Sequence, residues 1–343
     1  MKNRSATRFF AGFKVHPRIG FKPIENLCLP SRKRPSLENF DRNLSPRHNL
    51  DIYRLSQLTD LEKGLLAPME KNRDRYLAWL YFSIVYIFVS LFWVPAALLG
   101  LSIENSVVGL ILYYLGGIGP AFSAILLLSL MGSKEERKDY WLRIINLRRV
   151  PLTMYVFILL YFPIVAVLAS FSDVATGGRG GDISPLEVGL LNPLILIQSL
   201  MFLFLVGPFF EELGWRGYAL PKLLTPYTAL LSGTIIGTIW ALWHLPLFFI
   251  DGTFQSELSF LSQEFWLSMA DPFLVSIIIA WVFVNSNAST FSAMLFHFME
   301  NATGEMFPLS PTAQAIRIGL LVITVIALLI LYDGKTFTKL RFR

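Results

Sequence analysis

The chain contains a single cysteine, Cys28, among 343 residues, and it is poor in charge. One cysteine excludes an internal disulfide and a metal site built from several cysteines. Charged residues make up 16% of the chain, below the share of about a quarter in soluble domains, whereas hydrophobic residues make up 54%. A glycine-rich phosphate-binding motif, an internal repeat and the apolar core of a signal peptide are also missing. This composition excludes an ordinary soluble enzyme and indicates a membrane protein.

Long apolar runs predict the architecture. A helix needs about 20 apolar residues to cross the hydrocarbon layer, and no segment has the alternating pattern of a membrane β-strand. Eight runs approach the required length, the sixth and seventh being short: Tyr76–Gly100, Val107–Met131, Leu152–Phe171, Leu190–Phe210, Ala229–Ile250, Phe273–Val284, Phe291–Met299 and Ala313–Tyr332. We therefore expect an all-α, polytopic transmembrane helix bundle of about eight spans within residues 76–335.

Basic residues orient this bundle. The tail before Tyr76 contains sixteen Lys or Arg against eight acids, and the loop Gly132–Arg149 contains six more cations. Residues 336–343 are basic as well. Since an excess of Lys and Arg marks cytoplasmic segments, we expect both termini in the cytoplasm. The expected location is a bacterial plasma membrane, with an organellar membrane as the alternative.

Residues 1–75 form a separate basic region. Residues 1–50 are polar, with little periodic hydrophobicity, and are expected to be largely disordered; Leu50–Lys71 is expected to form an amphipathic surface helix. The first 24 residues contain six cations and no acid. That pattern is typical of an organellar transit peptide or of a tail lying on anionic lipid. The lipid bilayer is the expected partner, and no nucleic acid is expected.

Ionisable side chains are costly in a bilayer, so they usually pair with one another or have a function. The first of them, Glu211, Glu212 and Arg216, follow the fourth apolar run. On a helix Glu212 and Arg216 stand four residues apart and can pair along one face. Glu211 is left without a partner of its own and is a candidate general base. The alternative is a charge pair that anchors a helix end at the membrane interface.

Two later runs carry further polar side chains. Trp240 and His244 share one helical face, so an aromatic wall is expected beside the imidazole. His297 and Asn301 also share a face, where two donors suit a developing oxyanion. The alternatives are a hydrogen-bonded packing histidine near the interface and a polar clasp between helices.

The order EExxxR, aromatic-xxxH and HxxxN, each in an apolar segment, resembles the CAAX prenyl endopeptidase and bacteriocin-processing (CPBP) family of intramembrane proteases. The resemblance covers Glu211 to Asn301, roughly the last four helices. It implies that Glu211 is the general base that activates water, and that Glu212 and Arg216 support its placement.

The same resemblance assigns the later motifs. His244 would position or polarise the water, and His297 with Asn301 would stabilise the oxyanion of the tetrahedral intermediate. The second motif of the family usually begins with Phe, whereas Trp240 holds that position here, as an aromatic wall of the substrate pocket. The family includes enzymes that remove the last three residues of prenylated proteins and bacterial members that process peptides, so a prenylated protein or hydrophobic peptide is the expected partner.

Other functions stay open. No metal is firmly expected, but Glu211, His244 and His297 could bind zinc with a position left for water. A transporter, a haem protein with two histidine ligands and a catalytically inactive membrane scaffold are the alternatives.

The depths of two site residues in the membrane differ in this prediction. Ideal helices would leave Glu211 and His244 about 10 Å apart in depth. A helix tilt or a helix break must therefore bring them to the same level.

Overall fold

The computed structural model describes the backbone of residues 46–338 and the side chains of residues 68–338. Within that range the chain forms helices joined by loops, with one isolated β-bridge between Gly181 and Leu309. The predicted all-α class is confirmed. Residues 1–45 lie outside the described residues, and with them the transit peptide considered for the first 24 residues and most of the segment 1–50 expected to be disordered; residues 46–50 of that segment are helical. Most of the basic C-terminal segment 336–343 lies outside the described residues as well.

The chain divides into two compact units, Met1–Asp60 and Leu61–Arg343. The described residues of the first unit form the start of α1 (Pro46–Leu98), whose range includes the helix expected at Leu50–Lys71. The later helices belong to the second unit. They are α2 (Val107–Gly117), α3 (Gly119–Met131), α4 (Lys134–Ile145), α5 (Leu152–Ala175), α6 (Ser184–Leu191), α7 (Pro193–Phe204), α8 (Phe210–Gly214), α9 (Leu220–Leu224), α10 (Ala229–Trp243), α11 (Gln263–Asn285), α12 (Thr290–Met306) and α13 (Pro311–Leu331).

Among the described residues, six helices are long and apolar enough to cross a membrane, and a seventh span results if the bent pair α2–α3 is counted as one. The remaining predicted run, Phe291–Met299, lies in α12. This helix has 17 residues, at the lower end of the length that crosses hydrocarbon, and counted with the seven it gives the expected number of about eight. The chain is thus an integral, multi-pass membrane protein with one shorter polar helix inside its bundle.

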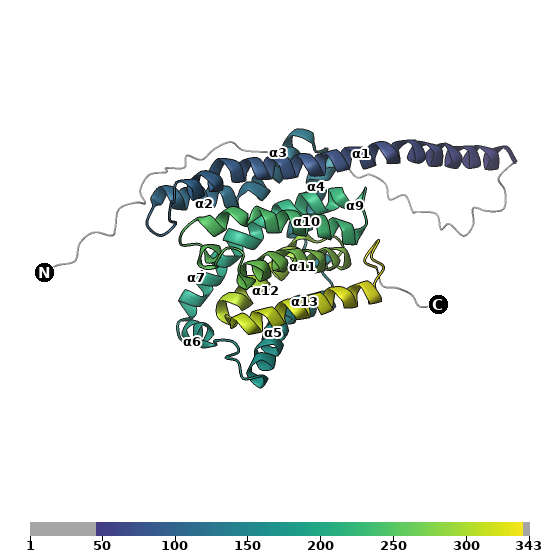
Figure 1. Ribbon diagram of the computed structural model, residues 1–343. Helices are drawn as coiled ribbons and strands as arrows, with labels where there is room; N and C mark the ends of the chain where they lie inside the picture. Colours follow the sequence, from purple (N-terminus) through teal and green to yellow (C-terminus); the bar gives the residue numbers. More distant parts are fainter. Residues whose placement is uncertain (1–45, 339–343) are drawn as a thin grey trace, which may run out of the picture. The chain divides into compact units, whose positions relative to one another are not determined.

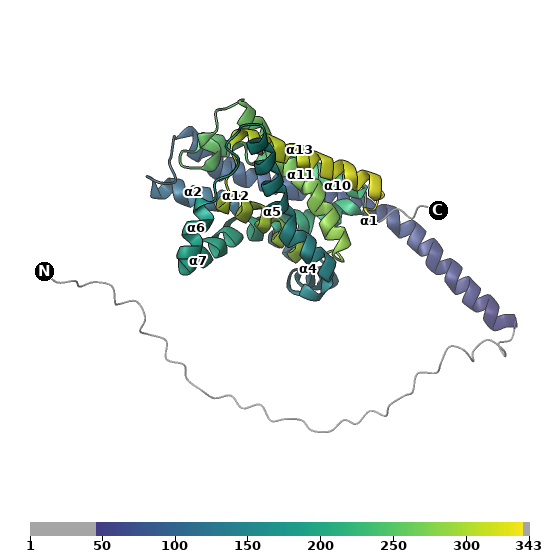
Figure 2. The same ribbon diagram turned by 90° about the horizontal axis from the view of Figure 1, so that it is seen from below.

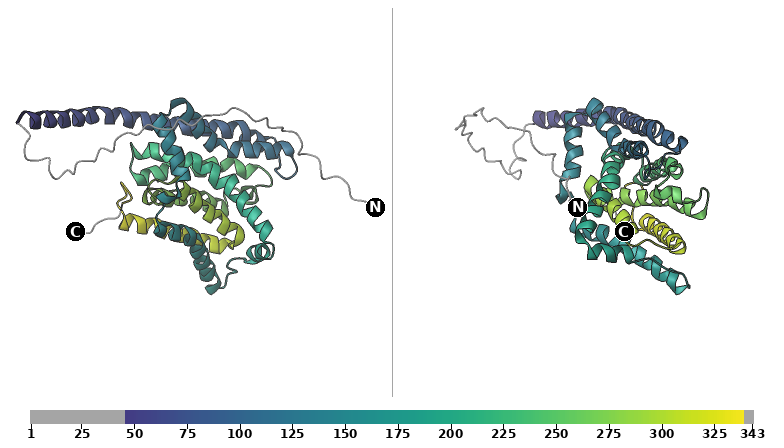
Figure 3. Two further views of the ribbon diagram at one scale, coloured as in Figure 1. Left: turned by 180° about the vertical axis from the view of Figure 1, so that it is seen from behind. Right: turned by 90° about the vertical axis from the view of Figure 1, so that its left-hand side faces the viewer.

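The second unit is built from helices that pack in layers. Helices α10, α11 and α13 lie one beside the next (Figure 1), and α11 contacts both of its neighbours. Helix α12 packs against α5 and α11, as the view from below shows (Figure 2). The same succession of layers is seen from behind in Figure 3. In this arrangement α12 lies inside the bundle, and its His297 and Glu300 side chains contact other helices.

The fourth span, Pro193–Leu224, is not a regular helix. Two π-helical turns, η3 (Leu205–Phe209) and η4 (Trp215–Ala219), lie on either side of α8. A π turn inserts an extra residue, so it rotates the following side chains relative to an unbroken α-helix, and such turns are frequent at functional sites. Pro208 lies in η3 and has no N–H to donate. This local irregularity determines where the acidic pair after it points.

Close helix packing holds α8 in place. A Cβ at Gly214 would collide with the Tyr81 hydroxyl and with the carbonyl oxygen of Pro120, so glycine is what allows α8 to approach α1 and α3. From the other side, the buried Tyr140 hydroxyl of α4 donates to the carbonyl oxygen of Leu213 over 3.0 Å. The segment is therefore held from three helices.

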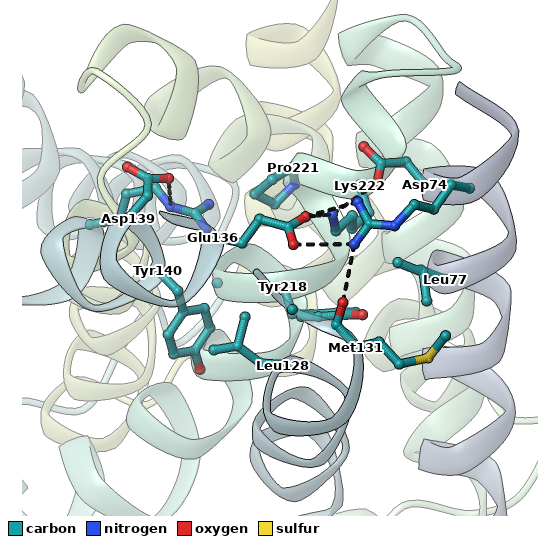
Figure 4. Close-up of a pocket in the computed structure, with 14 residues that line it drawn as sticks. Asp74, Leu77, Leu128, Met131, Glu136, Asp139, Tyr140, Tyr218, Pro221 and Lys222 are labelled. Atoms are coloured by element: carbon teal, nitrogen blue, oxygen red, sulfur yellow. Dashed lines mark hydrogen bonds and ion pairs between the residues drawn. The ribbon is translucent and has the colours of Figure 1, made fainter. Parts of the chain in front are cut away.

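A charged cluster fixes α4 beside this segment. Ser133 and Glu136 form a capping box at the start of α4. Glu136 also accepts hydrogen bonds from Arg73 at 3.1 Å and from Lys222 at 2.6 Å. Lys222 donates to Asp74 as well, at 2.8 Å. The side chains of Arg73, Asp74, Glu136 and Lys222 line a cavity of about 140 Å³ (Figure 4). Because each charge has a partner within the protein, the cluster serves to join α1, α4 and α9.

The Glu136 cluster predicts how stability depends on pH. Burial raises the pKa of Glu136, but hydrogen bonds from Arg73 and Lys222 outweigh it and lower that pKa from 4.5 to about 2. The carboxylate therefore stabilises the fold fully above pH 4.5, and this contribution is lost as the pH falls toward 2. We expect the thermal midpoints of wild type and Glu136→Gln, measured by fluorescence in detergent, to converge over that interval. A difference that stays constant or widens on acidification would contradict the assignment.

Candidate active site

The first sequence motif forms a fully buried ion pair. The Arg216 guanidinium donates to Glu212 Oε1 over 2.6 Å, and both side chains are completely buried. His297 of α12 adds a contact of 3.0 Å between its Nδ1 and the same carboxylate oxygen. A carboxylate only accepts, so Nδ1 of His297 carries the proton. Glu212 is thus shared by a cation and an imidazole, and it ties α12 to the fourth span.

Glu211 lies beside this pair and has a partner that local spacing did not predict. The indole N–H of Trp240 donates to Glu211 Oε2 over 2.6 Å, and both residues are buried. The expectation that Glu211 has no partner is therefore wrong. The contact joins residues 29 positions apart on two different spans, and no signal within either motif could have revealed it.

The imidazole of His244 is oriented by a hydrogen bond to the backbone. Nδ1 of His244 lies 2.9 Å from the carbonyl oxygen of Trp240. Since a carbonyl oxygen accepts and does not donate, Nδ1 is the protonated nitrogen, and Nε2 of the neutral ring is an acceptor. His244 follows the last residue of α10, where that helix gives way to the 3₁₀ turn η5 (Leu245–Phe249).

Asn301 and Glu211 face one small space next to Gly207. A Cβ at Gly207 would lie 3.3 Å from Asn301 Nδ2 and 3.7 Å from Glu211 Oε1. An amide donor and a carboxylate acceptor therefore both lie close to a position that carries no side chain. His297 and Asn301 share a helix face, as predicted, but His297 turns one nitrogen to Glu212 while Asn301 faces Gly207.

The structure thus brings the three motifs together. All six predicted polar residues lie in one region around Trp240: its ring centroid is 5.9 Å from that of His244 and 4.9 Å from that of His297, and the Arg216 guanidinium carbon lies 4.9 Å from it. Motif spacing alone could not establish this convergence.

One charged network next to the site was not predicted. Arg317 of α13 donates to Asp271 of α11 over 2.7 Å and to Glu300 of α12 over 2.9 Å. Glu300 directly precedes Asn301. The network therefore fixes the part of α12 that carries Asn301. Arg317 is the only charged residue of the apolar helix α13, which is the signal that could have identified the network.

The metal-binding alternative needs three ligands close together. Among the side chains of residues 68–338, no three His, Cys, Asp or Glu groups gather in an arrangement that could hold a metal ion. Glu211, His244 and His297 do not form such a group, and Nδ1 of His297 is bound to Glu212. The residues present do not fit the zinc site considered from the sequence.

Comparison with known proteins agrees with the motif pattern. Residues 193–303 match the family described as type II CAAX prenyl endopeptidase Rce1-like. The chain is also 30% identical over 268 residues to the CAAX prenyl protease 2 of Methanococcus maripaludis, an alignment that covers 77% of this chain and 96% of that relative. The side chains from Gly207 to Asn301 that form the site all lie inside the range of the family match.

Proposed function

This chain belongs to the type II CAAX prenyl endopeptidase family and is an intramembrane endopeptidase, and we propose that Glu211 activates the water that cleaves the peptide bond. The observation that carries the proposal is the convergence of all three motifs on one buried region. Glu211 Oε1 lies close to the position beside Gly207 that carries no side chain, and a carboxylate oxygen there can take a proton from a water within hydrogen-bond reach, as a general base must.

The proposed reaction begins with proton transfer. Water between Glu211 and the substrate gives a proton to Oε1, and the resulting hydroxide oxygen forms a bond to the scissile carbonyl carbon. The carbonyl oxygen becomes an oxyanion, which the Asn301 amide stabilises. His244 holds the water by accepting a hydrogen bond at Nε2. The proton on Glu211 then passes to the leaving amine as the C–N bond breaks.

A charged group beside the base supports the reaction, and it consists of Glu212, Arg216 and His297. Nδ1 of His297 donates to Glu212, so a second hydrogen bond from Nε2 to the oxyanion requires the doubly protonated ring. The Glu212 carboxylate offers that cation a partner. Arg216 keeps the carboxylate in place, at 2.6 Å. We assign to these three residues the positioning of the site and the stabilisation of developing charge.

We propose that the substrate is a prenylated protein or a hydrophobic peptide that enters from the lipid. The fourth span supports this, because only 6% of the residues in its most apolar stretch are buried in the protein. An apolar groove of about 320 Å³ lies between α7 and α12, lined by Ile197, Leu200, Met201, Phe204, Leu205 and Phe298. Leu205 precedes Gly207 by two residues and Phe298 precedes Asn301 by three, so the groove leads toward the site.

The membrane placement follows from charge. We propose that the loop Gly132–Arg149 and both termini face the cytoplasm, in agreement with their excess of Lys and Arg. The charged cluster around Glu136 lies at that same side of the fourth span, next to Lys222. A peptide from a cytoplasmic protein would then approach the site from the cytoplasm while its lipid stays in the bilayer.

Cleavage of defined peptides tests this function. The purified full chain in detergent is given a CAAX-type peptide with a farnesylated cysteine, or the same peptide without the lipid, and products are identified by mass spectrometry. We expect release of the tripeptide after the cysteine, with kcat/KM roughly tenfold or more higher for the lipidated peptide because the groove buries its apolar chain. Activity should survive exhaustive chelation.

Three results would contradict parts of the proposal. Equal cleavage of both peptides would contradict lipid recognition by the groove. Cleavage of neither peptide would contradict the substrate class. Activity that is lost on chelation and restored by zinc would contradict a reaction that needs only Glu211 to activate water.

A further inference from the structure

Trp240 contacts most of the polar groups of the site. It donates its N–H to Glu211, its backbone carbonyl accepts from His244, and its ring packs against Arg216 and His297. These contacts leave 3% of its surface exposed. A side chain that forms a wall for substrate needs a free ring face, and Trp240 offers very little.

The two oxygens of Glu211 have different surroundings. Oε2 is held by the indole N–H at 2.6 Å, whereas Oε1 is directed toward the space beside Gly207 that the Asn301 amide also faces. The last torsion of a glutamate side chain is broad, with little intrinsic preference. One strong hydrogen bond on Oε2 therefore determines the plane of the carboxylate and the direction in which Oε1 points.

From these contacts we infer that Trp240 is a positioning residue for Glu211, acting through its indole N–H. The inference rests on the proposed function of Glu211 as the base. Phenylalanine, which usually begins this motif in the family, has no N–H and could not hold the carboxylate in this way. The chain therefore uses a hydrogen bond at a position where the family pattern supplies an aromatic ring alone.

A replacement that removes only the indole N–H distinguishes the two possible roles of Trp240, orienting Glu211 or forming a wall of the substrate pocket. In Trp240→3-benzothienylalanine sulfur replaces the N–H and the ring keeps its shape. We expect this variant and Trp240→Phe to lower kcat for the farnesylated peptide by roughly tenfold to a hundredfold, as expected for a misplaced catalytic group. KM should change less than about twofold, since the substrate contacts are retained.

The matched control is Trp281→Phe. Trp281 is also buried, its N–H has no partner among the described residues, and it packs against Phe157 and Tyr332, which are not site residues. We expect wild-type kcat and KM for this variant. If Trp240 serves only as a wall, the benzothienyl variant will match wild type and Trp240→Phe will raise KM; that result overturns the inference and leaves the proposed function intact.

A spectroscopic measurement tests the contact without using activity. Ultraviolet resonance Raman difference spectra, each taken against the corresponding Trp240→Phe protein, isolate the indole band that reports N–H hydrogen bonding. We expect a strongly hydrogen-bonded indole in wild type and a weakly bonded one in Glu211→Leu. An unchanged band in Glu211→Leu would overturn the inference, whatever the kinetics of the protein. A wild-type protein that cleaves no peptide but passes this test would instead contradict the proposed function.

Discussion

Glu211→Gln is expected to lower kcat for the farnesylated peptide by about a thousandfold or more, within the range that general acid–base catalysis supplies. Gln retains the size and shape of the side chain, and its amide oxygen can still accept the N–H of Trp240. The change therefore removes the basic oxygen while preserving the contact of 2.6 Å that orients it. Steady-state kinetics on the purified protein measure the loss, and KM is expected to remain near that of wild type.

The matched control for this loss is Glu187→Gln, which makes the same chemical change at an exposed position in α6. We expect it to retain wild-type activity. The thermal midpoint of Glu211→Gln should also match wild type, which would show that the loss is chemical. Residual activity of Glu211→Gln within tenfold of wild type would contradict the role of Glu211 as the base.

The second large effect concerns stability. Arg216→Met is expected to destabilise the fold by about 3–5 kcal/mol, because it leaves the fully buried Glu212 carboxylate without its cation. His297 would be the remaining partner of Glu212. The free energy of unfolding can be measured by SDS titration in mixed micelles. The double variant Glu212→Gln/Arg216→Met should recover much of the loss, since it removes the orphaned charge as well.

An exposed ion pair provides the comparison. Arg149 lies 2.9 Å from Asp139, but the Asp139 side chain is 55% exposed. Arg149→Met should therefore cost less than about 1 kcal/mol. A single Arg216→Met variant that is as stable as wild type, or a double variant that is less stable than Arg216→Met, would contradict the account of a buried and mutually dependent pair.

The amino-acid sequence by itself determined the helical class, most of the spans and the local contacts of the site. Apolar runs of sufficient length must form helices in lipid, because every backbone polar group needs a partner within its own segment. The pairing of Glu212 with Arg216 and the bond from His244 to the Trp240 carbonyl also follow from local spacing, since both join residues four apart. Helical geometry brings such residues together wherever the helix lies.

Contacts between spans were decided only by the tertiary structure. His297 contacts Glu212, which lies 85 residues away in the chain, and Trp240 contacts Glu211, which lies 29 residues away. Nothing in the sequence pattern indicates either contact. Ideal helices would place Glu211 and His244 at different depths in the membrane. In the structure two π turns flank α8, and α10 ends at His244, where both side chains reach Trp240. The physical reason is that lipid and protein neighbours are both apolar. Hydrophobic patterning therefore identifies a span, but it does not reveal which helix that span will contact or at what height.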